Sequence, residues 1–161
     1  MKRTTQVLGL AGWLTLTFVA AALGARASIS ASDFYSTLSL PAWAPPAGLF
    51  GPVWTVLYAL MAVAAWLVWR EKERRPNTVA LVLYVVQLAA NTAWSWLFFG
   101  WKQGALAFVD ILALLALIIA TVIAFARIRT LAAILLLPYL LWVGSAAVLN
   151  YAVWQANPGA L

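Results

Sequence analysis

The 161-residue chain contains no cysteine and no histidine. Without thiols it can form neither disulfides nor thiolate nucleophiles. Without imidazole it lacks a Ser–His triad, typical zinc sites and a haem ligand. The lysines, Lys2, Lys72 and Lys102, lie outside or at the ends of apolar runs, so the buried Schiff-base lysine of a retinal protein is missing. Ordinary acid–base catalysis therefore lacks its usual groups, and we expect no metal site and no required cofactor.

Charge is also scarce, at 9% of the chain, whereas hydrophobic residues make up 66%. A soluble domain is about 25% charged and about 45–50% apolar, so this composition indicates an integral membrane protein. Five runs reach the roughly 20 apolar residues of a spanning helix, and the alternation of a membrane β-barrel is absent. We expect an all-α five-transmembrane-helix bundle, a single domain over 1–161. Its expected helices cover 6–25, 49–69, 78–100, 104–126 and 131–154, with a lid loop at 26–48.

The first run has an alternative interpretation. Lys2 and Arg3, the apolar stretch, and then Ala25-Arg26-Ala27 are also typical of a secretory signal with a small-residue cleavage site. The run is longer than the usual signal core of about 7–15 residues, which favours a retained helix.

The basic residues predict the orientation of the bundle. With five spans, the N-terminus and the second and fourth connections share one side, and Arg26 and Lys102 lie on the other. Because cytoplasmic loops are enriched in Lys and Arg, we expect a cytoplasmic N-terminus and an external C-terminus. The charges are split over short segments, which favours anionic lipid over a nucleic-acid partner. The basic residues on the first side are Lys2, Arg3, Arg70, Lys72, Arg74, Arg75, Arg127 and Arg129.

The connection over 26–48 is long and rich in proline. Pro41-Ala-Trp-Ala-Pro-Pro46 cannot lie inside a spanning helix, because proline removes a backbone donor and biases the preceding residue away from helix. We expect one helical turn over 33–38, capped by Ser32, followed by a stiff loop. Long connections of this kind are more often functional than idle.

Aromatic residues are abundant, with ten tryptophans. Those at helix ends, Trp66, Trp69, Trp101 and Trp154, fit the aromatic belt of a membrane interface. Trp54, Trp94 and Trp142 lie inside their helices instead. They either line a pocket or fill space between helices.

Polar residues inside the spans are the next clue. Gln87, Asn91 and Ser95 are spaced by four residues and form one stripe on the third helix, and Asn150 lies near the end of the fifth. Such groups normally face the bundle interior, as interhelical hydrogen bonds or as ligand contacts. Asp110 is the acid inside a span, either functional or hydrogen-bonded to another helix.

The residues expected to face the bundle interior lie mainly in the outer half of the membrane. Helix direction places Trp54, Tyr58, Asn91 and Trp94 in the outer half, and the stretch from Trp142 to Asn150 runs outward from the middle. We expect them to converge under the proline-rich loop. A few polar groups among many aromatics is typical of a pocket for a large, flat, apolar ligand. Ala146, one turn beyond Trp142, leaves room beside the indole.

At this point the chain resembles the TspO/MBR family, the tryptophan-rich sensory proteins that include the translocator protein or peripheral benzodiazepine receptor. The resemblance covers nearly the whole chain. It rests on Phe34-Tyr35, Pro41-Ala-Trp-Ala-Pro-Pro46, Phe50-Gly-Pro-Val-Trp-Thr-Val-Leu-Tyr-Ala-Leu-Met61, Gln87-Leu-Ala-Ala-Asn91, Trp94, Phe98-Phe-Gly100, Pro138-Tyr139, Trp142, Leu149-Asn-Tyr151, Trp154 and Asn157.

The resemblance implies a membrane protein, usually a homodimer, that binds a porphyrin such as protoporphyrin IX, and benzodiazepine-type compounds, beneath the first loop. It implies a bacterial inner-membrane location and a role in sensing or stress response. Some bacterial relatives look able to degrade porphyrin in light and oxygen with tryptophans that match Trp54 and Trp142. The implied ligand-binding positions are Tyr35, Trp43, Trp54, Asn91, Trp94, Trp142, Ala146 and Leu149.

Two positions depart from the family pattern. Leu40 stands where lysine often precedes the proline-rich run, and Gln155 stands where arginine is common. The first change removes a cation that could contact a porphyrin carboxylate or a lipid head group. The second makes specific cholesterol binding doubtful. Three functions remain open: a porphyrin-binding sensor, a light-dependent porphyrin-degrading enzyme, or a porphyrin or lipid transporter.

Overall fold

The structure, a computed structural model, describes residues 3–161; Lys2, counted in the charge argument, lies outside the described residues. Within that range the chain is all-helical, with five helices long and apolar enough to cross a membrane. The predicted five-helix membrane fold is thereby confirmed. The elements are α1 (Arg3–Ala27), α2 (Ala31–Thr37), η1 (Ala47–Leu49), α3 (Phe50–Trp69), η2 (Arg70–Glu73), α4 (Thr78–Ser95), η3 (Trp96–Gly100), α5 (Gly104–Ile128) and α6 (Thr130–Ala156).

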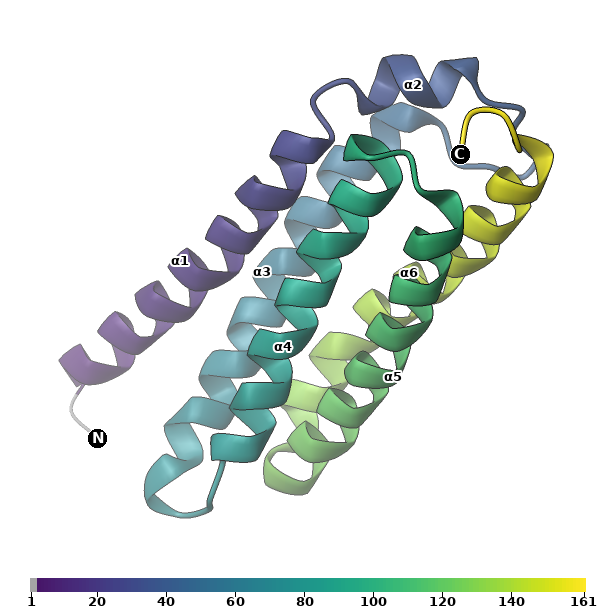
Figure 1. Cartoon of the computed structure of the whole chain (residues 1–161). Helices are drawn as coiled ribbons and strands as arrows, with labels where there is room; N and C mark the ends of the chain where they lie inside the picture. Colours follow the sequence, from purple (N-terminus) through teal and green to yellow (C-terminus); the bar gives the residue numbers. More distant parts are fainter. Residues whose placement is uncertain (1–2) are drawn as a thin grey trace.

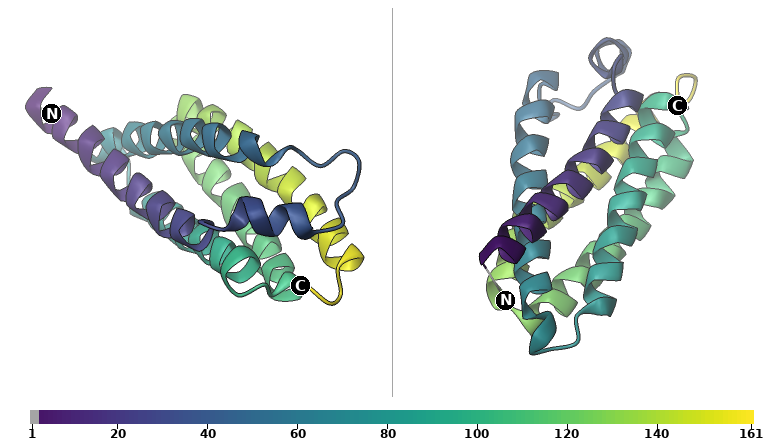
Figure 2. Two further views of the ribbon diagram at one scale, coloured as in Figure 1. Left: turned by 90° about the horizontal axis from the view of Figure 1, so that it is seen from above. Right: turned by 90° about the vertical axis from the view of Figure 1, so that its left-hand side faces the viewer.

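The five long helices form one bundle (Figure 1). α1 packs against α3 and α4, α3 also packs against α6, and α5 lies between α4 and α6. Short α2 lies across one end of the bundle, as the view from above shows (Figure 2, left). We call this the α2 end.

Small residues allow the helices to approach closely in the core. Ala62, Ala64 and Ala65 on α3 are fully buried. Without a hydrophobic driving force between helices in lipid, close packing of this kind is a main source of helix association. The gaps are filled by large side chains such as Tyr84 and Tyr139, which are also buried.

Hydrogen bonds tie α1 to its neighbours. The Trp66 indole donates to the Gln6 carbonyl at 2.9 Å, and the Thr17 and Tyr84 hydroxyls pair at 2.7 Å. Thr92 donates to the Ala20 carbonyl at 3.2 Å. The first helix is therefore an integral wall of the bundle.

The long connection contains more helix than the sequence predicts. α2 makes seven residues of helix and is preceded by Ser30, whose carbonyl accepts from the Phe34 amide at 3.0 Å. The prediction that Ser32 caps this segment was wrong, because the helix begins earlier and Ser32 lies within it. No side-chain cap is formed; Asp33 instead supplies a negative charge near the positive helix N-terminus.

The third span does not end as a regular α-helix. Over η3 the backbone widens into a π-helix, and the Trp101 amide bonds to the Trp96 carbonyl at 2.7 Å. Lys102 then adopts a left-handed backbone with φ 53° before α5 begins. Such π segments are rare and occur frequently at functional sites.

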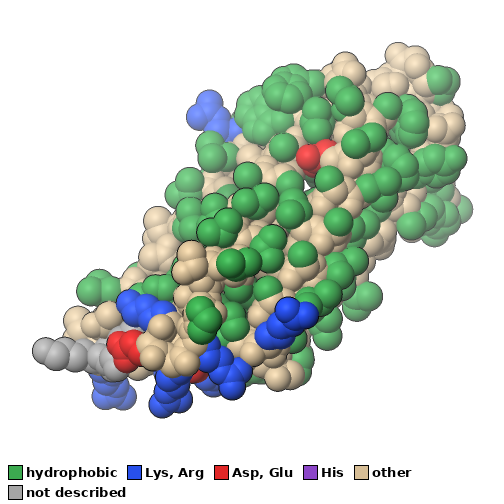
Figure 3. All heavy atoms as spheres, turned by 60° about the horizontal axis from the view of Figure 1, so that its bottom comes forward, with side chains coloured by type: hydrophobic (Ala, Val, Ile, Leu, Met, Phe, Trp, Pro, Cys, Tyr) green, Lys and Arg blue, Asp and Glu red, His purple; other side chains and the backbone are tan. Residues whose placement is uncertain are grey.

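Charge is concentrated at the end of the bundle opposite α2. Figure 3 shows most of the visible Lys and Arg side chains gathered there, while hydrophobic side chains cover much of the remaining surface. The Arg129 guanidinium pairs with Glu71 at 2.9 Å, and Arg75 donates to the Arg127 carbonyl at 2.8 Å. These contacts join the α3–α4 and α5–α6 connections. We call this the basic end.

Candidate ligand-binding pocket

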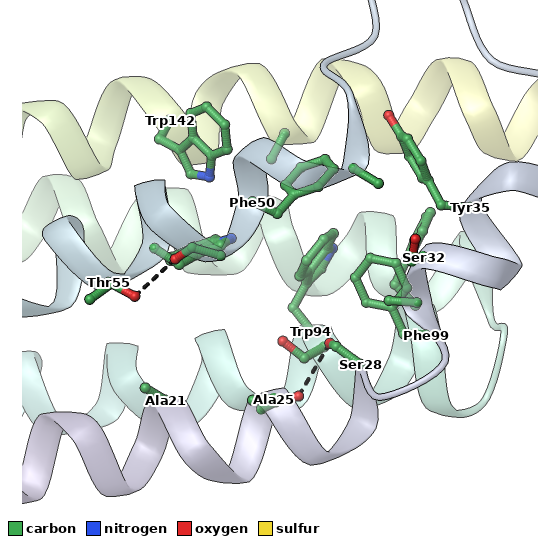
Figure 4. Close-up of a pocket in the computed structure, with 18 of the residues that line it drawn as sticks. Ala21, Ala25, Ser28, Ser32, Tyr35, Phe50, Thr55, Trp94, Phe99 and Trp142 are labelled. Carbon is green, nitrogen blue, oxygen red and sulfur yellow. Dashed lines mark hydrogen bonds between the residues drawn. The ribbon is translucent and has the colours of Figure 1, made fainter.

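A cavity of about 560 Å³ lies at the α2 end, between α1, α3, α4, η3 and α6 (Figure 4). Its volume falls within the range of about 300–1,000 Å³ that is usual for small-molecule sites. Its described lining includes no charged side chain. The lining residues are Phe18, Ala21, Ala22, Gly24, Ala25, Ser28, Ala31, Ser32, Tyr35, Ala47, Phe50, Gly51, Trp54, Thr55, Tyr58, Trp94, Ser95, Phe98, Phe99, Trp142, Ala146, Leu149, Asn150 and Val153.

Aromatic rings form much of the wall and hold one another in place. Trp54 stacks on Tyr58 with ring centroids 5.4 Å apart. Phe50 meets Trp142 edge-on at 6.0 Å and Tyr35 edge-on at 5.5 Å. Pairs in these geometries are mutually attractive beyond the area they bury. The wall therefore presents preformed ring surfaces on which a flat ligand could stack.

Most of the residues that the sequence singles out for binding meet in this cavity. The α2 lid contributes Tyr35, and α3 and α4 contribute Trp54 and Trp94. α6 contributes Trp142, Ala146 and Leu149. In Figure 4 the rings of Phe50, Trp94 and Trp142 lie around the same space, with Tyr35 at its α2 end.

Hydrogen bonds fix the polar part of this wall. The Trp94 indole donates to the Asn150 side-chain oxygen at 2.9 Å, and the Asn150 amide donates to the Gly104 carbonyl at 3.2 Å. Asn150 thereby joins α4, α5 and α6. Both ends of its amide are used within the protein, so its contribution is to orient the Trp94 ring.

Asn91 and Trp43 lie elsewhere. The Asn91 oxygen accepts from the Tyr58 hydroxyl at 2.6 Å and its amide donates to the Tyr139 oxygen at 3.1 Å; the residue is buried. Tyr139 in turn donates to Gln87 at 2.7 Å. Gln87 and Asn91 thus act as interhelical hydrogen-bonding groups, one of the two alternatives above. Trp43 is 56% exposed on the lid and does not line the cavity.

The sequence did not single out the α1 wall. Phe18, Ala21, Ala22, Ala25 and Ser28 line the cavity along one face of that helix. Alanines carry no chemical signal, which explains why they were missed. Their spacing of three and four residues marks one helix face and was the available pointer.

One hydrogen bond braces the lid internally, and contacts from Lys102 and Asn157 tie it to the rest of the bundle. The Tyr35 hydroxyl donates to the Pro45 carbonyl at 3.2 Å, and burial raises the pKa of that hydroxyl above its usual value. The Lys102 ammonium sits 4.7 Å from the centroid of the Phe34 ring. The Asn157 side chain accepts from the Ser39 amide at 2.8 Å and donates to the Ser39 carbonyl at 3.0 Å.

Asp110 lies on α5 outside the cavity lining. Its Oδ2 atom is buried, and within residues 3–161 that oxygen makes no hydrogen bond. The pocket chemistry is therefore that of stacked rings and a few hydroxyl and amide groups. It suits binding of a flat apolar molecule better than proton transfer.

The fold and the cavity define a class: a multi-pass membrane protein with an aromatic pocket beneath a helical lid. The TspO/MBR family profile matches residues 13–155 of the chain. The chain belongs to the TspO/MBR family.

Its relatives include bacterial and animal proteins. The tryptophan-rich protein TspO of Chlorobaculum tepidum is 42% identical over 132 residues, which is 80% of this chain and 82% of the relative. The Homo sapiens translocator protein is 42% identical over 128 residues, 78% of this chain and 76% of the relative. The tryptophan-rich sensory protein of Cereibacter sphaeroides is 38% identical over 148 residues, 89% of this chain and 91% of the relative.

Proposed function

We propose that this protein is a membrane sensor or regulator that binds a planar tetrapyrrole, of the protoporphyrin IX type, in the cavity at the α2 end. The observation that carries the proposal is the wall of Trp54, Trp94 and Trp142 around about 560 Å³ without a lining charge. Stacking on such rings suits a large flat π-system. The family membership supports the same ligand class.

In this proposal the pocket residues have distinct roles. Trp54 and Trp142 stack on the macrocycle, and Ala146 and Leu149 leave space along its edge. Tyr35 closes the α2 end. Asn91 supports Tyr58 from behind the wall through a hydrogen bond to its hydroxyl. Trp43 is exposed on the lid and turns toward the ligand or the membrane surface when the ligand is bound.

The protein is proposed to work as a homodimer in a bacterial inner membrane, with the basic end in the cytoplasm. The concentration of Lys and Arg at that end supports the orientation. A signal would follow from ligand-dependent ordering of the lid or of the dimer contact.

Tryptophan quenching on titration with protoporphyrin IX tests the binding site. We expect Ala146→Phe, which fills the space beside Trp142, to weaken binding at least tenfold. Val148→Phe is the matched control, because Val148 is 60% exposed and outside the lining. Equal affinity in the two variants would place the ligand elsewhere.

Light- and oxygen-dependent porphyrin degradation is a second candidate. The stacking of Trp54 on Tyr58 at 5.4 Å supports it, because two oxidisable rings in contact can share an electron deficiency. Illumination of the loaded protein should then bleach the porphyrin bands. Bleaching that continues unchanged in the Trp54→Phe/Trp142→Phe double variant would argue against catalysis by this protein.

A further inference from the structure

The cavity has an exposed rim between two helices. Among its lining residues, the exposed ones are Phe18, Ala22 and Ala25 on α1, Gly51 and Thr55 on α3, and Ser32 on α2. The lining residues from α4, η3 and α6 are buried or half-buried. The cavity is therefore open sideways, between α1 and α3.

This opening lies at the depth of lipid acyl chains. α1 ends at Ala27 and α3 begins at Phe50, both at the α2 end. With a helix rise of about 1.5 Å per residue, Thr55 lies about 8 Å and Phe18 about 14 Å inside the spans. Both depths fall within one half of a hydrocarbon core about 30 Å thick. Figure 4 shows Ala21 and Ala25 on α1 facing Thr55 across the space.

The side chains at the opening leave it unobstructed and mostly apolar. Ala22, Ala25 and Gly51 are small, and a Cβ built on Gly51 would meet no atom within 4 Å. The Thr55 hydroxyl donates to the Gly51 carbonyl of its own helix at 2.9 Å, so its donor is already satisfied. Phe18, 6.4 Å from Tyr58 between ring centroids, marks the deep end.

The opening becomes polar toward the α2 end. Ser28 and Ser32 line the cavity there, and Arg26, which precedes Ser28 by two residues, is exposed. A molecule that lay in the opening would therefore meet apolar groups at depth and the Ser28 and Ser32 side chains near the membrane surface, where Arg26 is also exposed. This polarity matches an amphiphile with a flat apolar body and an acidic edge.

We propose that the α1–α3 opening is a lateral entrance through which a planar acidic amphiphile, already dissolved in the membrane, reaches the pocket. The proposal rests on the proposed function of the cavity. The acidic edge passes along Ser28 and Ser32, and the apolar body passes between Ala22 and Thr55. The lid does not need to open, which agrees with its ties through Tyr35, Lys102 and Asn157.

The absence of native cysteines allows the entrance to be blocked selectively. Thr55→Cys is reconstituted in lipid vesicles and modified with N-cyclohexylmaleimide, which dissolves in the bilayer. Val56→Cys is the matched control, since Val56 is the next residue, is 59% exposed and does not line the cavity. A third protein, Ser39→Cys/Asn157→Cys, is joined by a short bis-maleimide to keep the lid shut. The association rate of protoporphyrin IX is followed by tryptophan quenching.

We expect modified Thr55→Cys to bind at least tenfold more slowly than unmodified Thr55→Cys but to reach the same final quenching. Because Thr55 also lines the cavity, an adduct that only filled the pocket would lower that final quenching and would count against the entrance. Modified Val56→Cys and the lid-tied protein should bind at the original rate. Slow binding in the lid-tied protein, with modified Thr55→Cys unaffected, would overturn the lateral entrance and leave the proposed function standing. The entrance would also be overturned if Thr55→Cys did not react with the maleimide and instead formed a disulfide-linked dimer. That result would show that a second copy of the chain covers the opening. Absence of quenching in the unmodified protein would reject the proposed function and the entrance together.

Discussion

At the scale of single residues, the polar groups inside the bundle act on the pocket from behind. Tyr58 forms part of the wall, and its hydroxyl is held by Asn91, which also bonds to Tyr139. A buried hydrogen bond within this low-dielectric interior fixes geometry because its loss leaves unsatisfied groups. The stripe on α4 therefore orients the stacked Trp54–Tyr58 pair.

Replacing Asn91 tests that role. We expect Asn91→Leu to lower the free energy of unfolding by about 1–3 kcal/mol, because the Tyr58 and Tyr139 hydroxyls lose a buried partner. Thermal unfolding in detergent measures the change. Ser145→Ala is the control, since the exposed Ser145 hydroxyl donates to the Trp142 carbonyl of its own helix at 2.7 Å. An Asn91→Leu protein as stable as this control would contradict a structural role for Asn91.

Two glycines on α1 offer a matched pair. A Cβ on Gly9 would overlap ring atoms of Trp69 on α3, whereas a Cβ on Gly12 would meet nothing within 4 Å. We expect Gly9→Ala to destabilise the protein by about 1–3 kcal/mol through overpacking. Gly12→Ala should be neutral or slightly stabilising, because alanine favours helix. Chemical denaturation in mixed micelles compares them; equal effects would mean that α1 does not pack on Trp69 as described.

At the scale of elements, the lid is held by a few hydrogen bonds and a cation–π contact. The Asn157 side chain at the end of α6 makes two hydrogen bonds to the Ser39 backbone, in the segment between α2 and the prolines. Few other groups could pair with a backbone amide and carbonyl at once, since the task needs both a donor and an acceptor. The C-terminal end of α6 therefore sets where the lid lies.

Removing this tie should loosen the lid without unfolding the bundle. We expect Asn157→Ala to increase amide hydrogen exchange over 38–45 at least tenfold, with exchange in α3 and α6 interiors unchanged. Asn157→Gln is a control of like chemistry and different length. Unchanged exchange over 38–45 in Asn157→Ala would show that Tyr35 and Lys102 hold the lid alone.

The long helices could be predicted from the sequence because spans of about 20 apolar residues have few other solutions in lipid. The aromatic wall could also be predicted from the sequence, since tryptophans such as Trp142 lie far from a helix end and so do not fit the aromatic belt of a membrane interface. Three features were not: the start of α2, the π-helical turn of η3, and the α1 wall. Each depends on tertiary contacts or on alanine and glycine, residues that carry no chemical group from which their position could be predicted before the helices are packed.

At the scale of the whole molecule, the two ends differ in chemistry. The basic end carries most of the Lys and Arg side chains and is tied by the Arg129–Glu71 pair. The α2 end carries the cavity, the lid and few charges. Cytoplasmic enrichment of basic residues orients membrane proteins, so this asymmetry supports the proposed orientation, in which the pocket faces outward.

The proposed outward orientation of the pocket can be tested directly because the chain has no cysteine of its own. Ser39→Cys marks the lid and Pro76→Cys marks the α3–α4 connection; both positions are exposed, and neither change alters the charge. In intact bacterial cells whose outer membrane has been permeabilised, we expect a membrane-impermeant maleimide to label Ser39→Cys. Pro76→Cys should react only after the inner membrane is broken, because the proposed orientation puts the basic connection in the cytoplasm. The reverse pattern would put the lid in the cytoplasm and would require ligand to reach the pocket from the inner leaflet.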